Sequence, residues 1–324
     1  MKVSIVSPLH IQPSKEWITA LDNEAKISGA DVIIVHDSWK IQKMKGLPKS
    51  WKVFTYTEQL KYFGKDLYSM FKQFHKSSSI KNFGMIYSYR EKYDVCIVID
   101  SDCIVQPDFV ALHLAALEIP GDGWQNPIPE TGLYSRGFPY SKRKQEKWCH
   151  MGLWTNELDL YGKDRIDNDN IPKELKISHA YNHVPGFIPL SGMNVSFKRE
   201  ALPYMLFLPN FTTDTGEKFI RHDDIWGGYI FQKIAKSMNK SISYGLPIVY
   251  HDTVVDPVAD AIEEEPMYKY EDEFIDMVDE AIHNPADLDA QQELELVKIY
   301  CRANSTFENL ESAFDFQLKA YANI

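Results

Sequence analysis

The chain has 324 residues, of which 44% are hydrophobic and 25% are charged, and this is the composition of an ordinary globular protein. Its net charge of -11 argues against nucleic acids and anionic membranes as partners, because nothing offsets the repulsion of phosphate groups. No apolar run approaches the roughly 18 residues of a membrane-spanning helix, so we expect no membrane insertion. The four cysteines lack zinc-site spacing and the N-terminus resembles a strand rather than a signal peptide, so we expect a cytoplasmic protein.

The first hundred residues alternate between strand and helix signals. Short runs rich in β-branched residues at 3–7 and 31–36 flank a helical stretch at 14–27, which predicts a parallel strand pair. A third such run at 95–100 follows another helical stretch. The pattern predicts an open α/β sheet covered by helices, in which ligands bind at the carboxyl ends of the strands.

The rest of the chain changes character twice. Residues 121–189 are rich in Pro, Gly, Asn, Asp and Trp, as in long insertions that carry function. Regular signals return with a helix at 223–238 and a strand at 241–251. Beyond residue 257 the chain becomes acidic and helical, and we expect two or three helices that pack on the body or on a partner subunit.

The sequence Asp100-Ser101-Asp102 directly follows the third predicted strand. Alternate carboxylates at a strand end can face one cleft and offer hard oxygen ligands to Mn²⁺ or Mg²⁺. An acidic surface turn is the alternative. His251 ends the strand at 241–251, where its imidazole is either a third metal ligand or a structural residue.

Three further segments are candidates for substrate contacts. Asp37 ends the second strand and either binds a base or ribose or makes an Asx turn. Asp223 and Asp224 begin an apolar helix, where they either cap it or orient sugar hydroxyls. The small-residue turn at 191–194 either allows close approach of a ligand or is a plain hairpin turn.

The segment RGFPYSKR, residues 136–143, contains two arginines around Gly, Pro and two aromatic residues. It is too interrupted for a helix and too basic for a core, so it is either a solvated loop or an anion-binding loop.

As an ordered set, these segments resemble the plant reversibly glycosylated polypeptides, whose members include UDP-arabinopyranose mutases. The matching segments are IIVHD (33–37), KNFG (81–84), VIDSDC (98–103), RGFPYSKR (136–143), MGLWTN (151–156), IPLSGMNVSFKRE (188–200), RHDDIWGGY (221–229) and GLPIVYH (245–251). The resemblance covers roughly residues 1–255. The family's triple aspartate is Asp-Ser-Asp here, and residues 144–150 are unlike the plant pattern.

The resemblance implies a GT-A-type nucleotide-sugar-binding domain at 1–255, with a C-terminal helical extension at 256–324. It implies an α/β fold with a mixed, mostly parallel sheet, a UDP-sugar substrate, UDP-arabinose above all, Mn²⁺ or Mg²⁺ as cofactor, and a possible homo-oligomer. The metal ligands would be Asp100, Asp102 and His251. The substrate-binding residues would be Asp37, as a uridine contact, and Asn82, Asp100, Gly192, Asn194 and Trp226.

The implied catalytic residues are Arg136, Arg143, Asp223 and Asp224. Arg143 would neutralise the diphosphate, while Arg136 would be the reversibly glycosylated arginine. Asp223 and Asp224, with Asn194, would hold the released sugar, and Trp154, Trp226 and Tyr229 would exclude water.

Three functions remain open at this point. A UDP-sugar mutase interconverts pyranose and furanose forms without an acceptor. A glycosyltransferase on the same fold releases UDP only when an acceptor is present. A non-catalytic protein binds the UDP-sugar without turnover.

Overall fold

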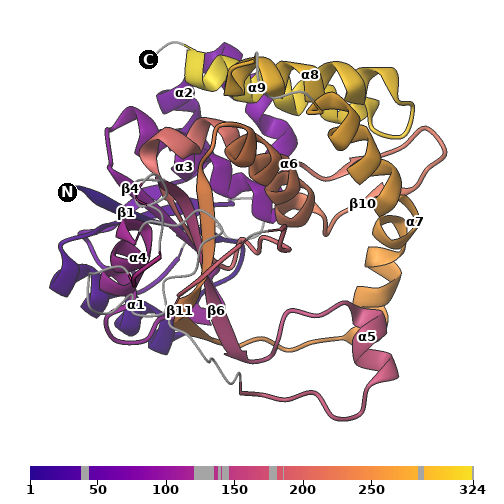
Figure 1. The fold of residues 1–324 in the computed structure, drawn as a ribbon. Coiled ribbons are helices and arrows are strands. Elements are labelled where there is room, and N and C mark those ends of the chain that lie inside the picture. The colour runs from indigo at the N-terminus through magenta and orange to yellow at the C-terminus, as the bar shows by residue number, and fades with distance from the viewer. Residues whose placement is uncertain are drawn as a thin grey trace.

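The computed structural model describes residues 1–37, 44–119, 135–137, 140, 146–174, 181–184, 186–283 and 288–322. Figure 1 shows a central sheet with helices packed around it, and the C-terminal helices lie across one end. The helices are α1 (Lys15–Ser28), α2 (Tyr56–Phe71), α3 (Asn82–Arg90), α4 (Phe109–Glu118), α5 (Gly162–Asp167), α6 (Asp223–Ser237), α7 (Pro257–Ala281), α8 (Ala290–Ala303) and α9 (Glu311–Ala322). The strands are β1 (Val3–Leu9), β2 (Asp31–His36), β3 (Lys52–Phe54), β4 (Val95–Ile99), β5 (Cys103–Ile104), β6 (Lys147–Asn156), β7 (Tyr181–His183), β8 (Asn194–Lys198), β9 (Phe211–Thr212), β10 (Lys218–Phe219) and β11 (Ser241–His251).

The main sheet of the described residues has the order β3-β2-β1-β4-β8-β6-β11-β5, and β7 pairs with β11. Strands β1, β2, β3, β4, β6 and β11 run in one direction, and β5, β7 and β8 run in the other. The sheet is therefore mixed and mostly parallel. The α/β fold class expected from the sequence, with helices on the sheet and at the C-terminal end, is confirmed.

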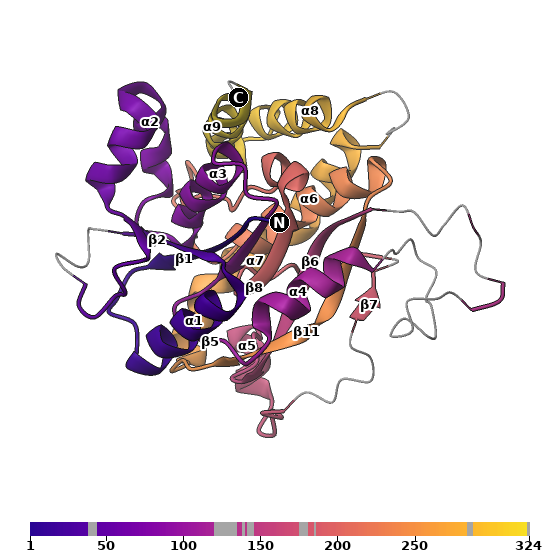
Figure 2. The same cartoon turned by 90° about the vertical axis from the view of Figure 1, so that its left-hand side faces the viewer.

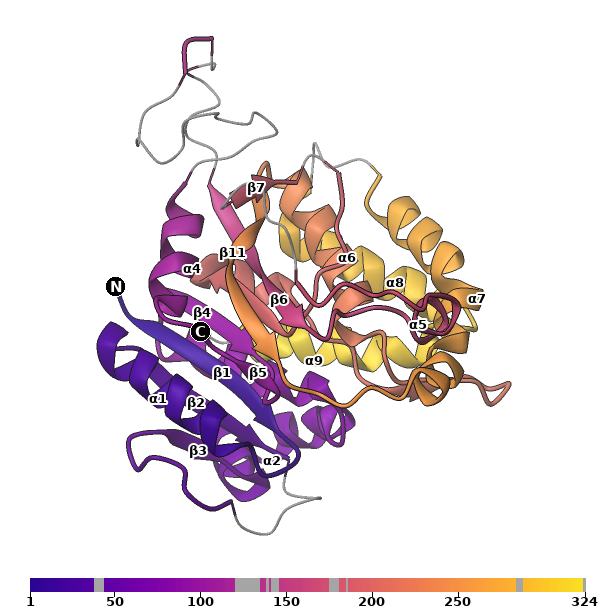
Figure 3. The same cartoon turned by 90° about the horizontal axis from the view of Figure 1, so that it is seen from below.

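The two faces of the sheet carry separate hydrophobic cores because successive strand residues point to opposite faces. In β2, Val32 and Ile34 join one core, whereas Ile33 and Val35 join the other. The first core packs against α1 and α4, and the second packs against α3, α6 and the C-terminal helices (Figures 2 and 3). Strands buried on both faces have the continuous apolar runs that made β1, β2 and β4 visible in the sequence.

Local capping signals set the ends of several helices. Ser14 accepts a hydrogen bond from the backbone N–H of Trp17 at the start of α1, and Gly29 ends that helix in the left-handed conformation. Asp289 and Gln292 form a reciprocal capping box at the start of α8. These interactions satisfy backbone groups that a helix end otherwise leaves unpaired.

The C-terminal helices share the core of the sheet rather than standing apart from it. Phe274 of α7 stacks on Trp226 of α6 with ring centres 4.2 Å apart, and Phe316 of α9 lies 5.4 Å from Phe71 of α2. In Figure 1, α8 and α9 lie above α6 and α3. The division of the chain at residue 255 stays a prediction.

Among the described residues, no helix is both long and apolar enough to cross a membrane.

Candidate functional site

Four of the predicted site residues lie where parallel strands of the sheet end. Asp37 follows β2, Asp100 and Asp102 follow β4, and His251 is the last residue of β11. Because β2, β4 and β11 run in the same direction, their carboxyl ends lie at one edge of the sheet. The strand-end residues therefore share an edge, as the sequence predicted.

Asp102 and His251 face each other at this edge. Asp102 Oδ2 lies 3.6 Å from His251 Nε2, which is longer than a hydrogen bond. His251 Nδ1 lies 2.6 Å from the carbonyl oxygen of Glu157, so Nδ1 carries the proton and the Nε2 lone pair faces the carboxylate in the neutral ring. Burial lowers the pKa of His251, but Asp102 offsets this and the net shift is upward. The Nε2 lone pair and the Asp102 carboxylate repel each other. A cation between them, either a proton or a metal ion, would therefore stabilise the pair.

The donor set at this pair suits a hard or intermediate divalent ion. A carboxylate oxygen and an imidazole nitrogen are ligands for Mn²⁺, and Cys103 completes a group whose ligand atoms lie within 4.8 Å of one another. Burial raises the pKa of the Cys103 thiol well above its usual value, and its Sγ donates to Asp102 Oδ1 at 3.7 Å. Sulfur is also a soft ligand, which Mn²⁺ and Mg²⁺ do not favour. Asp102 and His251 thus fit a metal, and Cys103 does not add to it.

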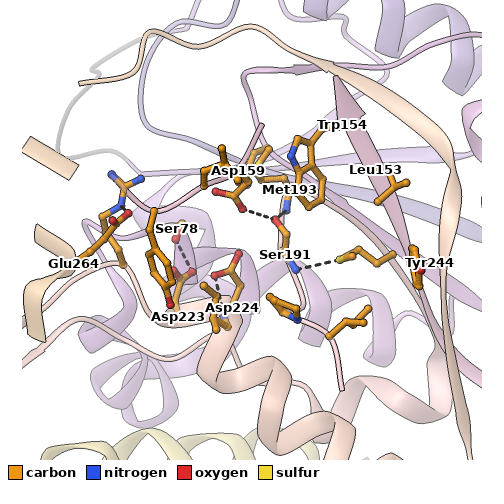
Figure 4. Close-up of a pocket in the computed structure, with 18 of the residues that line it drawn as sticks. Ser78, Leu153, Trp154, Asp159, Ser191, Met193, Asp223, Asp224, Tyr244 and Glu264 are labelled. Carbon is orange, nitrogen blue, oxygen red and sulfur yellow. Dashed lines mark hydrogen bonds and ion pairs between the residues drawn. The ribbon is translucent and has the colours of Figure 1, made fainter. Parts of the chain in front are cut away.

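A cavity of about 700 Å³ has Asp100 in its lining, and Figure 4 shows other residues that line it, among them Asp159 and Asp223. Its walls include Trp154, Tyr161 and Ile188. The charged residues that line it are strongly unbalanced, with two cations against seven carboxyl groups: Lys81 and Arg221; Asp100, Asp159, Asp164, Asp223, Asp224, Glu264 and Glu271. The volume suits a small ligand, and the charge favours the neutral, hydroxyl-bearing part of one.

Lys81 is the cation at the floor of the cavity and is 1% exposed. Its Nζ donates to Asp100 Oδ1 at 3.0 Å and to the carbonyl oxygen of Gly192 at 3.4 Å. Burial alone would lower the pKa of Lys81, but the neighbouring aspartates raise it to about 12. Lys81 therefore stays positively charged. Its hydrogen bond occupies Asp100 Oδ1, which leaves less of this carboxylate for a metal ion.

Asp223 and Asp224 lie in the first turn of α6 and point into the cavity. Both oxygens of Asp224 accept backbone N–H groups, from Gly192 at 2.7 Å and from Ile225 at 2.9 Å. Asp223 accepts from the Ser78 hydroxyl at 2.5 Å. Burial and the neighbouring Asp224 raise the pKa of Asp223 to about 7. The N-cap of α6 is His222, so neither aspartate caps the helix, although Asp224 accepts one first-turn N–H group, from Ile225. Both carboxylates bind protein donors and still line the cavity.

Asp37 is fully buried, and its carboxylate already accepts hydrogen bonds from several groups. These are His10 Nδ1 at 3.1 Å, the Lys76 backbone N–H at 2.8 Å and the Tyr56 hydroxyl. The Tyr56 ring stacks on His75 with centres 3.9 Å apart. A uridine that binds at Asp37, as predicted, must share this carboxylate with the groups that hold it.

Three predicted substrate contacts do not reach the cavity lining. The Asn82 amide bonds both the N–H and the carbonyl oxygen of Phe207. Asn194 is fully buried and bonds His113 and two backbone carbonyls. Trp226 is 1% exposed and stacks on Phe274 in the core. The polar atoms of both asparagines are thus used within the fold, and the tryptophan is a packing residue.

Gly192 does allow a close approach, but by the protein itself. A Cβ at this position would lie 2.6 Å from Phe207 Cε1 and 2.9 Å from Lys81 Nζ. The missing side chain of Gly192 thus makes room for the buried lysine.

Arg136 lies in the described segment 135–137, where it is exposed, and it does not line the cavity. Arg143 lies outside the described residues. Their predicted roles at the sugar and the diphosphate stay predictions.

Several charged residues of the cavity were not singled out from the sequence, and Lys81 and Asp159 are two of them. Lys81 opens the KNFG segment, and Asp159 follows β6 within residues 121–189, where no regular pattern was recognised. A lysine immediately before a buried helix was the one signal available for Lys81. Nothing in the sequence sets Asp159 apart from the other acidic residues near it.

Comparison with known proteins places this chain in a family. The model of the family "Reversibly glycosylated polypeptide" matches residues 15–320. The chain belongs to this family. The match extends well beyond residue 255, so it includes the C-terminal helices that the sequence resemblance left out.

One similar protein of this family, from Oryza sativa subsp. japonica, is named probable inactive UDP-arabinopyranose mutase 2. It is 27% identical over 187 residues, which is 53% of this chain and 53% of that protein. The chain thus matches about half the length of this relative.

Two solved structures of glucosyl-3-phosphoglycerate synthase from Mycobacterium tuberculosis are similar in fold, each at 12% identity. The complex with phosphoglyceric acid has a TM-score of 0.42 and covers 79% of this chain and 72% of its own. The complex with Mn²⁺ and uridine-diphosphate-glucose has a TM-score of 0.46 and covers 82% and 76%.

Proposed function

We propose that this protein is a UDP-sugar mutase of GT-A type that interconverts the pyranose and furanose forms of a UDP-linked sugar, with UDP-arabinose as the preferred substrate. One observation carries the proposal: the Asp102–His251 pair adjoins, at the same sheet edge, an acidic cavity with apolar walls. A nucleotide sugar has matching parts, with an anionic diphosphate beside a neutral sugar. Family membership supports the same substrate class.

Asp102 and His251 would hold the divalent ion, Mn²⁺ or Mg²⁺. Such an ion, when bound, neutralises the charge that builds up on a departing diphosphate. Asp100 precedes Asp102 by two residues and pairs with Lys81, so the lysine places a second positive charge in the lining of the cavity. The bond between the β-phosphate and the sugar would lie between the two positive sites.

The cavity would hold the sugar after this bond breaks. Asp223 and Asp224 accept hydrogen bonds from sugar hydroxyls and stabilise positive charge at the anomeric carbon. Trp154, Tyr161 and Ile188 exclude water, which would otherwise hydrolyse the sugar. In this proposal Arg143 contacts the diphosphate, and the sugar transfers reversibly to Arg136 as a side reaction.

The direct test is to incubate the pure protein with UDP-arabinopyranose and Mn²⁺ and to separate the nucleotide sugars by chromatography. We expect UDP-arabinofuranose without any acceptor. The His251→Ala variant removes one metal ligand, and we expect its affinity for Mn²⁺, measured by calorimetry, to fall about 10-fold or more. Intact mass before and after incubation measures sugar attachment, and the Arg136→Ala variant shows whether Arg136 carries the sugar.

Two outcomes would contradict the mutase proposal. Release of UDP that strictly requires an added acceptor would indicate a glycosyltransferase. Binding of UDP-arabinopyranose with Mn²⁺ but with neither product would indicate a binding protein, which the name of the rice relative makes a specific alternative.

A further inference from the structure

We propose that Asp159 is the acid–base residue of the cavity, which moves one proton between two oxygens of the bound sugar. This inference rests on the proposed mutase function and assigns a step of it to a residue that the sequence reading did not single out.

Asp159 follows β6 and lines the cavity, with its side chain open to it (Figure 4). The Ser191 hydroxyl donates to Asp159 Oδ2 at 3.3 Å. Among the described residues this is the one hydrogen bond to its carboxyl group, and it is long. The carboxyl group is thus positioned toward the ligand space and remains able to exchange a proton there.

The same turn that holds Asp159 also holds Asp224. Ser191 donates its hydroxyl to Asp159, and the next residue, Gly192, donates its backbone N–H to Asp224. Two carboxyl groups bound to consecutive residues of one turn lie close together. The pKa of Asp159 is raised to about 6. The causes are the protein atoms packed around its carboxyl group, which still faces the cavity, and the negative charge of Asp224.

The neighbouring carboxyl groups are less suited to proton transfer. Both oxygens of Asp224 accept backbone N–H groups, which favours a fixed acceptor role. Asp223 is 7% exposed and bonds Ser78, so it presents less of its carboxyl group to a ligand. Asp159 combines open access with a position beside these fixed acceptors.

Pyranose–furanose interconversion needs a group of this kind because its net change moves one proton. First, the bond between C1 and the β-phosphate oxygen breaks, and its electron pair stays on the phosphate. The O4 hydroxyl then passes its proton to Asp159 while an O4 electron pair forms the C1–O4 bond. The C1–O5 bond breaks, its electron pair stays on O5, and Asp159 returns the proton to O5. A β-phosphate oxygen finally bonds to C1, so no water or other reactant is consumed.

The test compares Asp159→Asn with wild type, using UDP-arabinopyranose and Mn²⁺. Asparagine keeps the shape and can still accept from Ser191, but it cannot carry the proton. We expect kcat for interconversion to fall about 100-fold or more, as is typical when a general acid–base group is lost. We expect Kd for the same UDP-sugar, measured by calorimetry, to change less than about 3-fold, since binding groups remain.

A second variant separates chemistry from structure. Asp159→Ala leaves space beside Ser191, and added formate supplies a carboxyl group of the right kind there. We expect formate to restore activity about 10-fold or more in Asp159→Ala but not in Asp159→Asn, where the amide fills the space. Asp167→Asn, an exposed aspartate outside the cavity lining, is the matched control and should behave as wild type.

The outcomes are distinguishable. If wild type interconverts the sugars and Asp159→Asn retains kcat within about 3-fold, the role of Asp159 is overturned while the mutase function stands. Failure of formate to restore any activity in a folded, UDP-sugar-binding Asp159→Ala protein also overturns it. If wild type does not interconvert the sugars at all, the proposed function falls, and this inference falls with it.

Discussion

Two lysines of this chain are equally buried but have opposite surroundings. Lys81 at the cavity floor and Lys147 at the start of β6 are each 1% exposed. Lys81 donates to Asp100 and lies near two further aspartates, which raise its pKa to about 12 against the effect of burial. Lys147 donates to the carbonyl oxygen of Ala116 at 2.6 Å, and burial, with the nearby charge of Lys198, lowers its pKa to about 7.

The two lysines thus differ in what surrounds the amine: carboxylates stabilise the positive charge of Lys81, whereas Lys147 contacts a backbone carbonyl oxygen. Around Lys81 the protein has gathered carboxylates that would repel one another without it. Lys147 caps the last turn of α4 (Phe109–Glu118), where a neutral amine also makes the hydrogen bond. Only the first arrangement is expected where a ligand bears charge.

The largest effect should come from removing the cavity lysine. Lys81→Met keeps the length of the side chain but leaves Asp100 without its buried partner, beside Asp223 and Asp224. We expect the free energy of unfolding in urea to fall by about 3 kcal/mol, as for other broken buried ion pairs.

The matched control is Lys26→Met, which breaks an exposed pair with Asp22 on α1. We expect a change of less than about 0.5 kcal/mol there, because surface pairs contribute little. Equal effects at the two sites would show that the cavity floor is as well solvated as the surface, and the contrast between buried and exposed pairs would fail.

Much of the fold was predictable because its signals are local. Strands β1, β2 and β4 are continuous apolar runs, and α6 and β11 follow recognisable patterns. Strand β6 was not predicted, although it lies inside the sheet, because Lys147 and His150 interrupt its apolar pattern. Their partners, Ala116 and Ser243, are 31 and 93 residues away along the chain, so burial of these polar groups cannot be read locally.

The site divides in the same way. Asp37, Asp100, Asp102 and His251 were found because a strand end is a local feature that the sequence reveals. Lys81 and Asp159 depend on which segments meet in three dimensions, and the polar atoms of Asn194 are used by distant backbone groups. The position of a residue at a strand end is thus predictable from sequence, whereas the residues that its side chain contacts are not.

A smaller effect should follow from filling the space beside Lys81. Gly192→Ala places a methyl group 2.6 Å from the ring of Phe207 and 2.9 Å from Lys81 Nζ. We expect a loss of about 1–3 kcal/mol in urea unfolding, the usual cost of overpacking. Gly186→Ala, with no atom within 4 Å of the added Cβ, is the control and should be nearly neutral. Wild-type stability of Gly192→Ala would mean that the lysine can shift, and that its position is not fixed by packing.

The remaining effect tests the other lysine and depends on pH. Burial lowers the pKa of Lys147 to about 7, whereas an unfolded lysine has a pKa of about 10.4. Between these values the unfolded chain holds a proton that the native protein lacks, so this group's contribution to stability increases as pH rises through that range. We expect the stability of wild type minus that of Lys147→Met to rise from pH 7 to pH 9, by at most about 1.4 kcal/mol per pH unit. Lys147→Arg, which cannot lose its proton, should be less stable than wild type at pH 9, and its difference from Lys147→Met should not rise with pH. A wild-type difference that is flat across this range would mean that Lys147 stays charged inside the fold, and that the two buried lysines are alike after all.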